Sequence, residues 1–254
     1  MIQELNEGYF MSNILCEIKK DSKCKEKFLM TGNAHLKGVV TVSGSKNAAL
    51  PIICATLMHP GIYTLKNVPE INDVKVMFEI IEKLGGKVFR KKLNVYEIDT
   101  KDVNSWEPDL RLVRNVRASI LLIGPLLYRF GRVRIAQPGG CFIGSRPLLT
   151  HFKALRDMGV RIIRSGEYYN ISIKKLKDNN TIILRELSVT ATAIAIMVAA
   201  LTKKTTIRLA AAEPHVEDLC DFLKKMGVNL RGGGTHNVIV FKTRLSSGVN
   251  HNII

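Results

Sequence analysis

The sequence predicts an α/β fold built from three repeats of a βαβαββ unit. The repeats align on three short segments, Leu84-Gly85-Gly86, Met158-Gly159-Val160 and Met226-Gly227-Val228. Glycine commonly ends an α-helix because it adopts the left-handed backbone conformation without strain. Hydrophobic runs recur at matching positions before and after each segment. Repeats of this size bury their apolar faces only against one another, so we expect the three copies to form one compact domain.

Each repeat is expected to hold two helices of different character. The first helix is apolar on every side and is expected at residues 48–58, 118–128 and 191–201. The second is amphipathic and ends at the glycine segment, at residues 74–84, 148–158 and 216–226. A strand precedes each first helix, another lies between the helices (62–65, 133–135, 206–209), and two more follow, as at 160–163 and 169–173. A helix that is hydrophobic all round has to be buried, so the first helices should lie inside the domain.

The composition is that of an ordinary globular protein with a basic surface. Hydrophobic residues make up 46% and charged residues 24% of the 254-residue chain, which is long enough for one large or two small domains. The net charge of +16 favours anionic partners. Nucleic acid is one such partner, but the sequence contains no recognisable nucleic-acid-binding motif and only 6% aromatic residues, which argues against it. A lysine-rich solvated surface explains much of the excess charge.

The cysteines and apolar runs indicate a cytoplasmic protein without a metal or a cofactor. Five scattered cysteines (Cys16, Cys24, Cys54, Cys141, Cys220) form no C-x-x-C pair, which argues against a disulfide framework and a zinc site. The longest apolar runs fall short of the ~20 residues that a membrane-spanning helix needs. Residues 1–27 lack the uninterrupted apolar core of a secretory signal.

A reactive site is predicted in residues 137–147, QPGGCFIGSRP. Its glycines let the backbone approach a ligand, and Arg146 near Cys141 favours the thiolate and can bind phosphate or carboxylate. The alternative is an ordinary turn with a buried cysteine. Two further segments favour an anion site: Lys46-Asn47 begins the first apolar helix, and Arg117 begins the next.

Together these segments resemble the enolpyruvyl transferase family. The motifs SGSKNAALPI (43–52), VRASI (116–120), PGGCFIGSRP (138–147) and SVTAT (188–192) occur in the family's order and approximate spacing. The resemblance extends from about Phe28 to the end of the chain. It implies an inside-out α/β barrel domain, of which family members have two, each with three repeats. The cysteine segment is similar to the branch that uses a UDP-sugar and not to the shikimate branch.

For the UDP-sugar branch, the resemblance implies transfer of an enolpyruvyl group from phosphoenolpyruvate to the 3-hydroxyl of UDP-N-acetylglucosamine, with release of phosphate. This reaction is the first committed step of peptidoglycan precursor synthesis. Cys141 would be the general acid, and also the nucleophile toward phosphoenolpyruvate and the antibiotic fosfomycin. Phosphoenolpyruvate would contact Lys46, Asn47 and Arg146. The sugar nucleotide would contact a larger set, namely Arg117, Arg146, Pro147, Leu148, Leu149, Thr150, Leu187, Ser188 and Val189.

The sequence departs from the family pattern at one of these positions and at the residue before Leu187. Glu186 stands where the family often has a lysine beside the diphosphate, and Leu149 stands where an aspartate is common. A carboxylate at position 186 would repel diphosphate, so either a neighbour such as Arg185 compensates or nucleotide affinity is reduced.

The chain contains one set of three repeats. We expect residues 1–27 to be an N-terminal extension, 28–45 a strand segment that normally belongs to the second domain, 46–243 the three-repeat domain and 244–254 the start of a crossover to the second domain. A separate chain could supply the C-terminal half. Two alternatives stay open: an incomplete or non-catalytic half-molecule that binds sugar nucleotide, and a shikimate-branch transferase.

Overall fold

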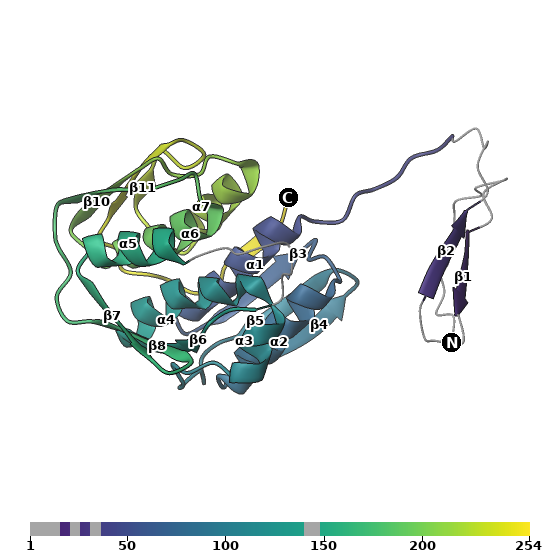
Figure 1. Cartoon of the computed structure of the whole chain (residues 1–254). Helices are drawn as coiled ribbons and strands as arrows, with labels where there is room; N and C mark the ends of the chain where they lie inside the picture. The colour runs from purple at the N-terminus through teal and green to yellow at the C-terminus, as the bar shows by residue number, and fades with distance from the viewer. Residues whose placement is uncertain (1–15, 21–25, 31–36, 140–147) are drawn as a thin grey trace. The chain divides into compact units, whose positions relative to one another are not determined.

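The computed structural model describes residues 16–20, 26–30, 37–139 and 148–254, in two compact units divided between Val42 and Ser43. In the first unit, strands β1 (Cys16–Lys20) and β2 (Glu26–Met30) pair antiparallel, with Cys16 opposite Met30. The second unit contains the three repeats and is shown with its elements labelled in Figure 1.

The repeats follow one another along the second unit. The first consists of α1 (Lys46–Ala55), η1 (Thr56–Met58), β3 (Ile62–Lys66), α2 (Asn72–Lys83), β4 (Lys87–Lys92) and β5 (Val95–Asp99). The second consists of α3 (Leu110–Asn115), η2 (Arg117–Leu122), α4 (Ile123–Phe130), β6 (Arg132–Ala136), α5 (Leu149–Asp157), β7 (Val160–Ser165) and β8 (Tyr168–Ile173). The third consists of β9 (Asn180–Ile183), α6 (Val189–Ala199), β10 (Lys204–Arg208), α7 (Pro214–Lys225), β11 (Leu230–Arg231) and β12 (Asn237–Phe241), and β13 (Asn250–Asn252) follows.

The predicted α/β repeats are confirmed in the described chain. Each expected helix is present, with its bounds shifted by at most a few residues. Gly85, Gly159 and Gly227 follow the second helices with positive φ angles of 104°, 96° and 97°, as expected of helix-ending glycines. Helix α3 was not predicted, and the second apolar helix starts with the 3₁₀ turns of η2 before it continues as α4.

The sheets of the first and third repeats have the same topology. The third sheet has the order β11-β12-β10-β9, with β9 parallel to β10 and the other pairs antiparallel. The first sheet has the order β4-β5-β3-β13, with β13 parallel to β3. Strand β13 therefore takes the place of the opening strand in the first repeat. Residues 244–254, expected to begin a crossover, include this strand and complete the first sheet.

The sheet of the second repeat has the order β6-β8-β7 and is antiparallel. No described strand lies beside β6 on its other edge. Instead, the backbone N–H of Arg134 donates to the carbonyl of Trp106 at 3.2 Å. An irregular segment thus occupies the edge that β9 and β13 fill in the other two sheets.

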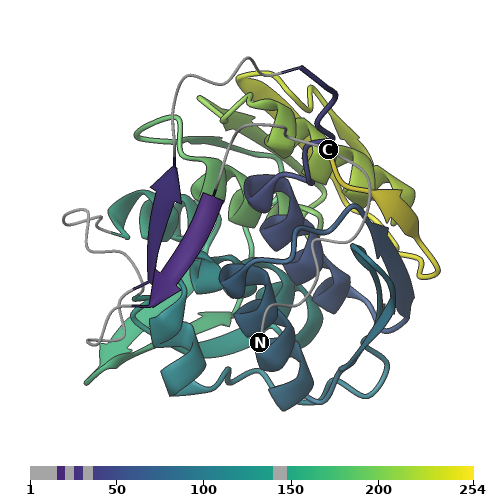
Figure 2. The same ribbon diagram turned by 90° about the vertical axis from the view of Figure 1, so that its right-hand side faces the viewer.

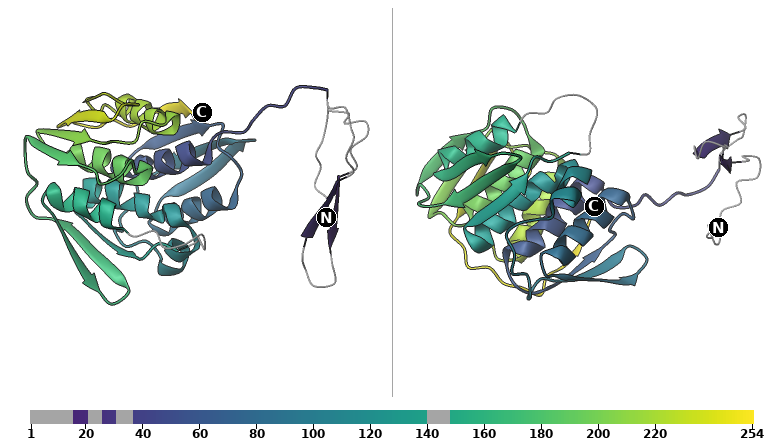
Figure 3. Two further views of the ribbon diagram at one scale, coloured as in Figure 1. Left: turned by 45° about the horizontal axis from the view of Figure 1, so that its top comes forward. Right: turned by 60° about the horizontal axis from the view of Figure 1, so that its bottom comes forward.

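Helices α1, α4 and α6 lie inside, with the three sheets around them (Figure 2). Every residue of α6 from Ala191 to Ala199 is buried, as the uniformly apolar sequence predicted. The helices approach closely at Gly124, where an added Cβ would lie 2.8 Å from the sulfur of Met197. The sheets and the amphipathic helices α2, α5 and α7, which have exposed residues, form the outside of the unit, and Figure 3 shows it from two further directions.

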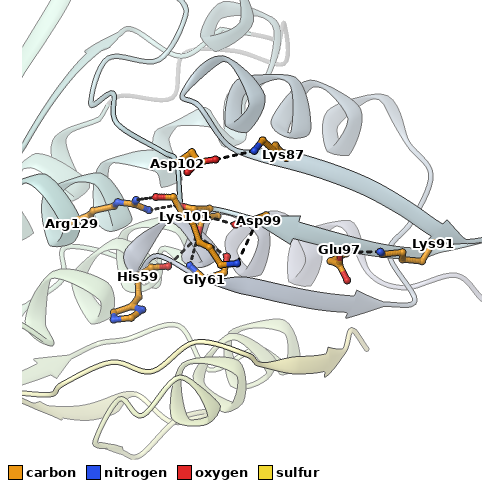
Figure 4. Close-up of polar contacts among 10 residues, drawn as sticks. His59, Gly61, Lys87, Lys91, Glu97, Asp99, Lys101, Asp102 and Arg129 are labelled. Carbon is orange, nitrogen blue, oxygen red and sulfur yellow. Dashed lines mark hydrogen bonds and ion pairs between the residues drawn. The ribbon is translucent and has the colours of Figure 1, made fainter.

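A buried polar junction joins the first two repeats (Figure 4). The guanidinium of Arg129, at the end of α4, donates to the carbonyls of Thr100 at 2.9 Å and Val103 at 2.8 Å. The Thr100 hydroxyl lies in turn within hydrogen-bond distance of the carbonyls of Thr56, His59 and Gly61. Burial lowers the pKa of Arg129, although an arginine keeps its charge in proteins. The junction satisfies carbonyl groups that helix and sheet leave unpaired.

Candidate functional site: converging helix N-termini

The N-termini of α1 and α2 lie together, and α7 packs beside α1. Lys46, the first residue of α1, has its Nζ 3.2 Å from Oδ2 of Asp73, in the first turn of α2. The N–H of Ser45 donates to the carbonyl of Ile254 at 2.6 Å. The N–H of Ile254 donates at 3.3 Å to the carboxylate of Asp218, in α7. The end of the chain therefore links the start of α1 to α7.

A second group of N-termini belongs to η2, α5 and α6. Nε2 of His151, in the first turn of α5, lies 2.7 Å from Oγ1 of Thr190, in the first turn of α6. The charge of Arg117, the first residue of η2, acts on the same imidazole. Helix η2 packs against α1, and α4, which continues η2, packs against η1, which continues α1. The two apolar helices therefore run in the same direction, and their N-termini lie at one end of the helix bundle.

Local sequence explains why helices η2 and α6 begin where they do. The buried hydroxyl of Ser119 lies within hydrogen-bond distance of the carbonyls of Val113 at 2.9 Å and Val116 at 2.7 Å, and this contact fixes the turn between α3 and η2. Oγ of Ser188 accepts from the N–H of Ala191 at 3.3 Å and caps α6. These short polar side chains satisfy backbone groups that the helix ends would otherwise leave unpaired.

This end of the bundle is a candidate anion site. Each helix N-terminus carries a partial positive charge and N–H groups without an intrahelical acceptor. Lys46 and Arg117 add two full positive charges at the first residues of α1 and η2. Phosphate and carboxylate groups are the ligands that such an arrangement binds.

A carboxylate also lies in this region. Oγ1 of Thr150, the second residue of α5, donates to Oε1 of Glu186 at 2.8 Å. Beside it, His151 is 6% exposed, and its Nδ1 has no partner among the described residues. Burial lowers the pKa of His151 to about 4, helped by Arg117 and opposed by Glu186. The imidazole is therefore neutral at pH 7.

The predicted site residues fall into three sets. Arg117, Leu148, Leu149, Thr150, Leu187, Ser188 and Val189 are at the N-termini of η2, α5 and α6. Lys46 and Asn47 form the start of α1. Cys141, Arg146 and Pro147 lie outside the described residues. Gly139 precedes them, and an added Cβ there would lie 2.1 Å from the carbonyl oxygen of Arg114, so only glycine fits.

Sequence reasoning missed the polar contacts that organise this end. It did not select His151, Thr190 or Asp73, whose partners come from other helices. A weak signal existed for His151, which occupies a buried position of an amphipathic helix next to a predicted contact residue. Within the described ranges, no three His, Cys, Asp or Glu side chains are grouped so that they could hold a metal ion. No helix there is long and apolar enough to cross a membrane.

The sequence profile of the EPSP synthase (3-phosphoshikimate 1-carboxyvinyltransferase) family matches residues 30–254. The chain belongs to this family. Among its relatives is the UDP-N-acetylglucosamine 1-carboxyvinyltransferase of Geobacter metallireducens, 39% identical over 230 residues, which cover 90% of this chain and 55% of the relative. The enzyme of that name from Geotalea uraniireducens is 38% identical over 231 residues, which cover 90% of this chain and 55% of that enzyme.

The fold of this EPSP synthase family member is similar to that of a solved enolpyruvyl transferase. NikO from Streptomyces tendae superimposes with a TM-score of 0.74 at 19% identity, over 86% of this chain and 52% of NikO. The chain thus spans about half the length of the relatives that it matches. The predicted enolpyruvyl transferase fold is confirmed.

Proposed function

We propose that the protein takes part in the transfer of an enolpyruvyl group from phosphoenolpyruvate to the 3-hydroxyl of UDP-N-acetylglucosamine. The observation that carries the proposal is the convergence of helix N-termini with Lys46 and Arg117, which suits two anionic substrates. The names and identities of the relatives favour the UDP-sugar over shikimate 3-phosphate. This reaction would place the protein in peptidoglycan precursor synthesis and in the cytoplasm.

In the proposed reaction the 3-hydroxyl oxygen bonds to C2 of phosphoenolpyruvate and loses its proton to a base. Cys141 donates a proton to C3, which gives a tetrahedral adduct. C3 then loses a proton while the bond between C2 and the phosphate oxygen breaks, and phosphate leaves. We assign the phosphoenolpyruvate contacts to Lys46, Asn47 and Arg146, and the positive charges of Lys46 and Arg146 stabilise the departing phosphate.

We assign the sugar nucleotide to the N-termini of η2, α5 and α6. Arg117 supplies a cation there, and the exposed side chains of Leu149 and Leu187 supply apolar surface beside the helix ends. The sugar nucleotide and phosphoenolpyruvate would then occupy neighbouring helix N-termini, as a transfer between them requires.

The test is phosphate release from phosphoenolpyruvate by the 254-residue chain, with and without UDP-N-acetylglucosamine. Release that needs both the sugar nucleotide and Cys141 supports the proposal, and Cys141→Ala is the control. Release that persists in Cys141→Ala contradicts the assigned role of the cysteine. If neither substrate binds in a calorimetric titration, the assignment of this site is wrong.

The second candidate function is sugar-nucleotide binding without turnover. Two observations favour it: the chain spans about half the length of its relatives, and Glu186 lies where the diphosphate is expected. A separate chain that supplies the second half would then restore turnover. Binding of UDP-N-acetylglucosamine without phosphate release would identify this function.

A further inference from the structure

The sheet of the second repeat packs one face on helices α4 and α5 and turns the other outward. Val133 and Ile135 of β6 are buried, whereas Arg132 and Arg134 are exposed. Because side chains alternate between the two faces of a strand, both arginines lie on the outward face. The strand register places four further residues on that face, namely Tyr168, Asn170 and Ser172 of β8 and Arg161 of β7. These six residues define the outer face of the second sheet.

Two arginines of the outer face are stacked on aromatic rings. The guanidinium carbon of Arg132 lies 3.7 Å from the ring centroid of Trp106, and that of Arg134 lies 4.2 Å from the ring centroid of Tyr168. Trp106 is held beside β6, since its carbonyl accepts the N–H of Arg134. A guanidinium over a ring is a planar cation with restricted freedom. A ligand that stacks on these two stacked pairs therefore loses less affinity to the ordering of side chains.

A second feature of the outer face is a hydroxyl between two arginines. Arg132 of β6 and Arg161 of β7 both stand opposite Ser172 of the middle strand. Neighbouring strands are about 4.8 Å apart, so the two long side chains can reach the same anion above Ser172. Neither arginine has a carboxylate partner among the described residues. The protein itself therefore leaves both charges available to a ligand.

Two carboxylates border the outer face, and both are paired. Glu107 pairs with Arg134 at 2.9 Å, and Glu167 pairs with Arg114 at 2.6 Å. The remaining arginines of the face leave it positively charged, as is the whole chain with its net charge of +16. A surface of this charge favours the approach of polyanions.

We propose that the outer face of the second sheet binds single-stranded nucleic acid. A phosphate group binds above Ser172 between Arg132 and Arg161, and unpaired bases stack on the two stacked pairs. Asn170, in the middle of the face, can both donate hydrogen bonds to base edges and accept them. None of these residues belongs to the candidate site at the helix N-termini, so this inference is independent of the proposed enzymatic function.

The stacked pairs favour single-stranded nucleic acid over other polyanions. An acidic protein segment would use the charges of the arginines but has no bases to stack on them. A double-stranded nucleic acid keeps its bases stacked on one another, so it offers this face mainly its phosphates. The aromatic content of the sequence is low, but its single tryptophan, Trp106, and Tyr168 both lie at this one sheet.

The test measures binding of fluorescently labelled RNA and DNA single strands of about 12 nucleotides to the 254-residue chain by fluorescence anisotropy. The double variant Arg132→Gln with Arg161→Gln should lower the affinity at least about tenfold. It should also make the dependence of log affinity on log salt concentration less steep by about 1.4, because two phosphate contacts are lost. Tyr168→Leu removes a ring but no charge, so it should lower the affinity at least about fivefold and leave the salt dependence unchanged.

The matched control is Arg208→Gln with Arg231→Gln, which removes two exposed arginines from the sheet of the third repeat and should leave the affinity unchanged. Equal losses for the two double variants would show attraction by overall charge and overturn the inference. Wild-type affinity in Tyr168→Leu, or equally tight binding of a duplex of the same length, would overturn it as well. Displacement of the strand by polyglutamate at equal charge would identify an acidic protein segment as the partner instead. Urea unfolding midpoints equal to that of the wild type establish that the variants are folded.

Discussion

The imidazole of His251 and the carboxylate of Asp218 form a buried pair, with Nε2 and Oδ1 2.9 Å apart and side chains 3% and 6% exposed. The second carboxylate oxygen of Asp218 accepts the N–H of Ile254 at 3.3 Å. Asp218 of α7 therefore contacts both His251 of β13 and Ile254, and Ile254 in turn contacts Ser45. The first sheet and the start of α1 depend on this contact.

Replacement of Asp218 should destabilise the fold. Asp218→Ala leaves the buried His251 ring and the part-buried Ile254 N–H without their acceptor, so we expect a loss of about 2–4 kcal/mol in the free energy of unfolding. Asp218→Asn should lose less, because its amide oxygen still accepts. Urea unfolding measures both, with Asp221→Ala, an exposed carboxylate of the same helix, as the control. A loss below about 0.5 kcal/mol for Asp218→Ala would show that the pair has little effect.

Stability should depend on pH through His151. Its pKa is about 4 in the folded chain against 6.5 as the unperturbed value, so the unfolded chain binds this proton first as pH falls. Folded-state stability is therefore fully present above pH 6.5 and falls between about pH 6.5 and 4, by about 3 kcal/mol. Urea unfolding at pH 7, 5.5 and 4 tests this. In His151→Gln, which does not titrate, the decline should be smaller by that amount, and identical declines would rule out His151 as the cause.

Replacement of Arg129 by lysine should destabilise the fold. Lysine keeps the charge, but its single ammonium cannot reproduce the fork that donates to the carbonyls of Thr100 and Val103. We expect Arg129→Lys to lower the free energy of unfolding by about 1–3 kcal/mol. Arg161→Lys on the exposed face of β7 is the matched control and should change it by less than about 0.5 kcal/mol. Similar unfolding midpoints for the two variants would contradict a structural role for the Arg129 fork.

Lys46 should contribute to phosphoenolpyruvate binding and little to stability. Its ion pair with Asp73 is exposed, with the two side chains 51% and 37% exposed, so the pair contributes about 0–1 kcal/mol. Lys46→Met should weaken phosphoenolpyruvate binding at least about tenfold without a change in the unfolding midpoint. Asp73→Asn removes the same ion pair and keeps the lysine. If both variants bind phosphoenolpyruvate as the wild type does, Lys46 is not a ligand of this substrate.

The repeat pattern predicted the architecture because its signals, apolar helices and helix-ending glycines, lie within short segments and recur along the chain. Wholly apolar helices such as 191–201 have one stable place, inside the bundle, and glycines such as Gly159 mark the helix ends. The pairing of β13 with β3 was not predictable in this way, because it joins residues far apart in the sequence. Helix α3 was missed because a short segment rich in arginine carries little periodic signal.

Residues of the candidate site were predicted from sequence motifs, but the contacts between them were not predicted. Lys46 and Arg117 were selected as residues at the starts of helices, which can be recognised from sequence, and Ser188 was selected from the resemblance to the family. The hydrogen bond from Thr150 to Glu186 and the contact of His151 with Thr190 join side chains 36 and 39 residues apart. Such contacts arise only when α5 and α6 pack, so a single sequence gives no direct signal for them.

The hydrogen bond between Ser45 and Ile254 places the two ends of the three-repeat unit next to each other. New termini cut into an exposed turn, such as the one around Gly166, with a short linker from Ile254 to Ser43, should therefore leave the unit folded as a circular permutant.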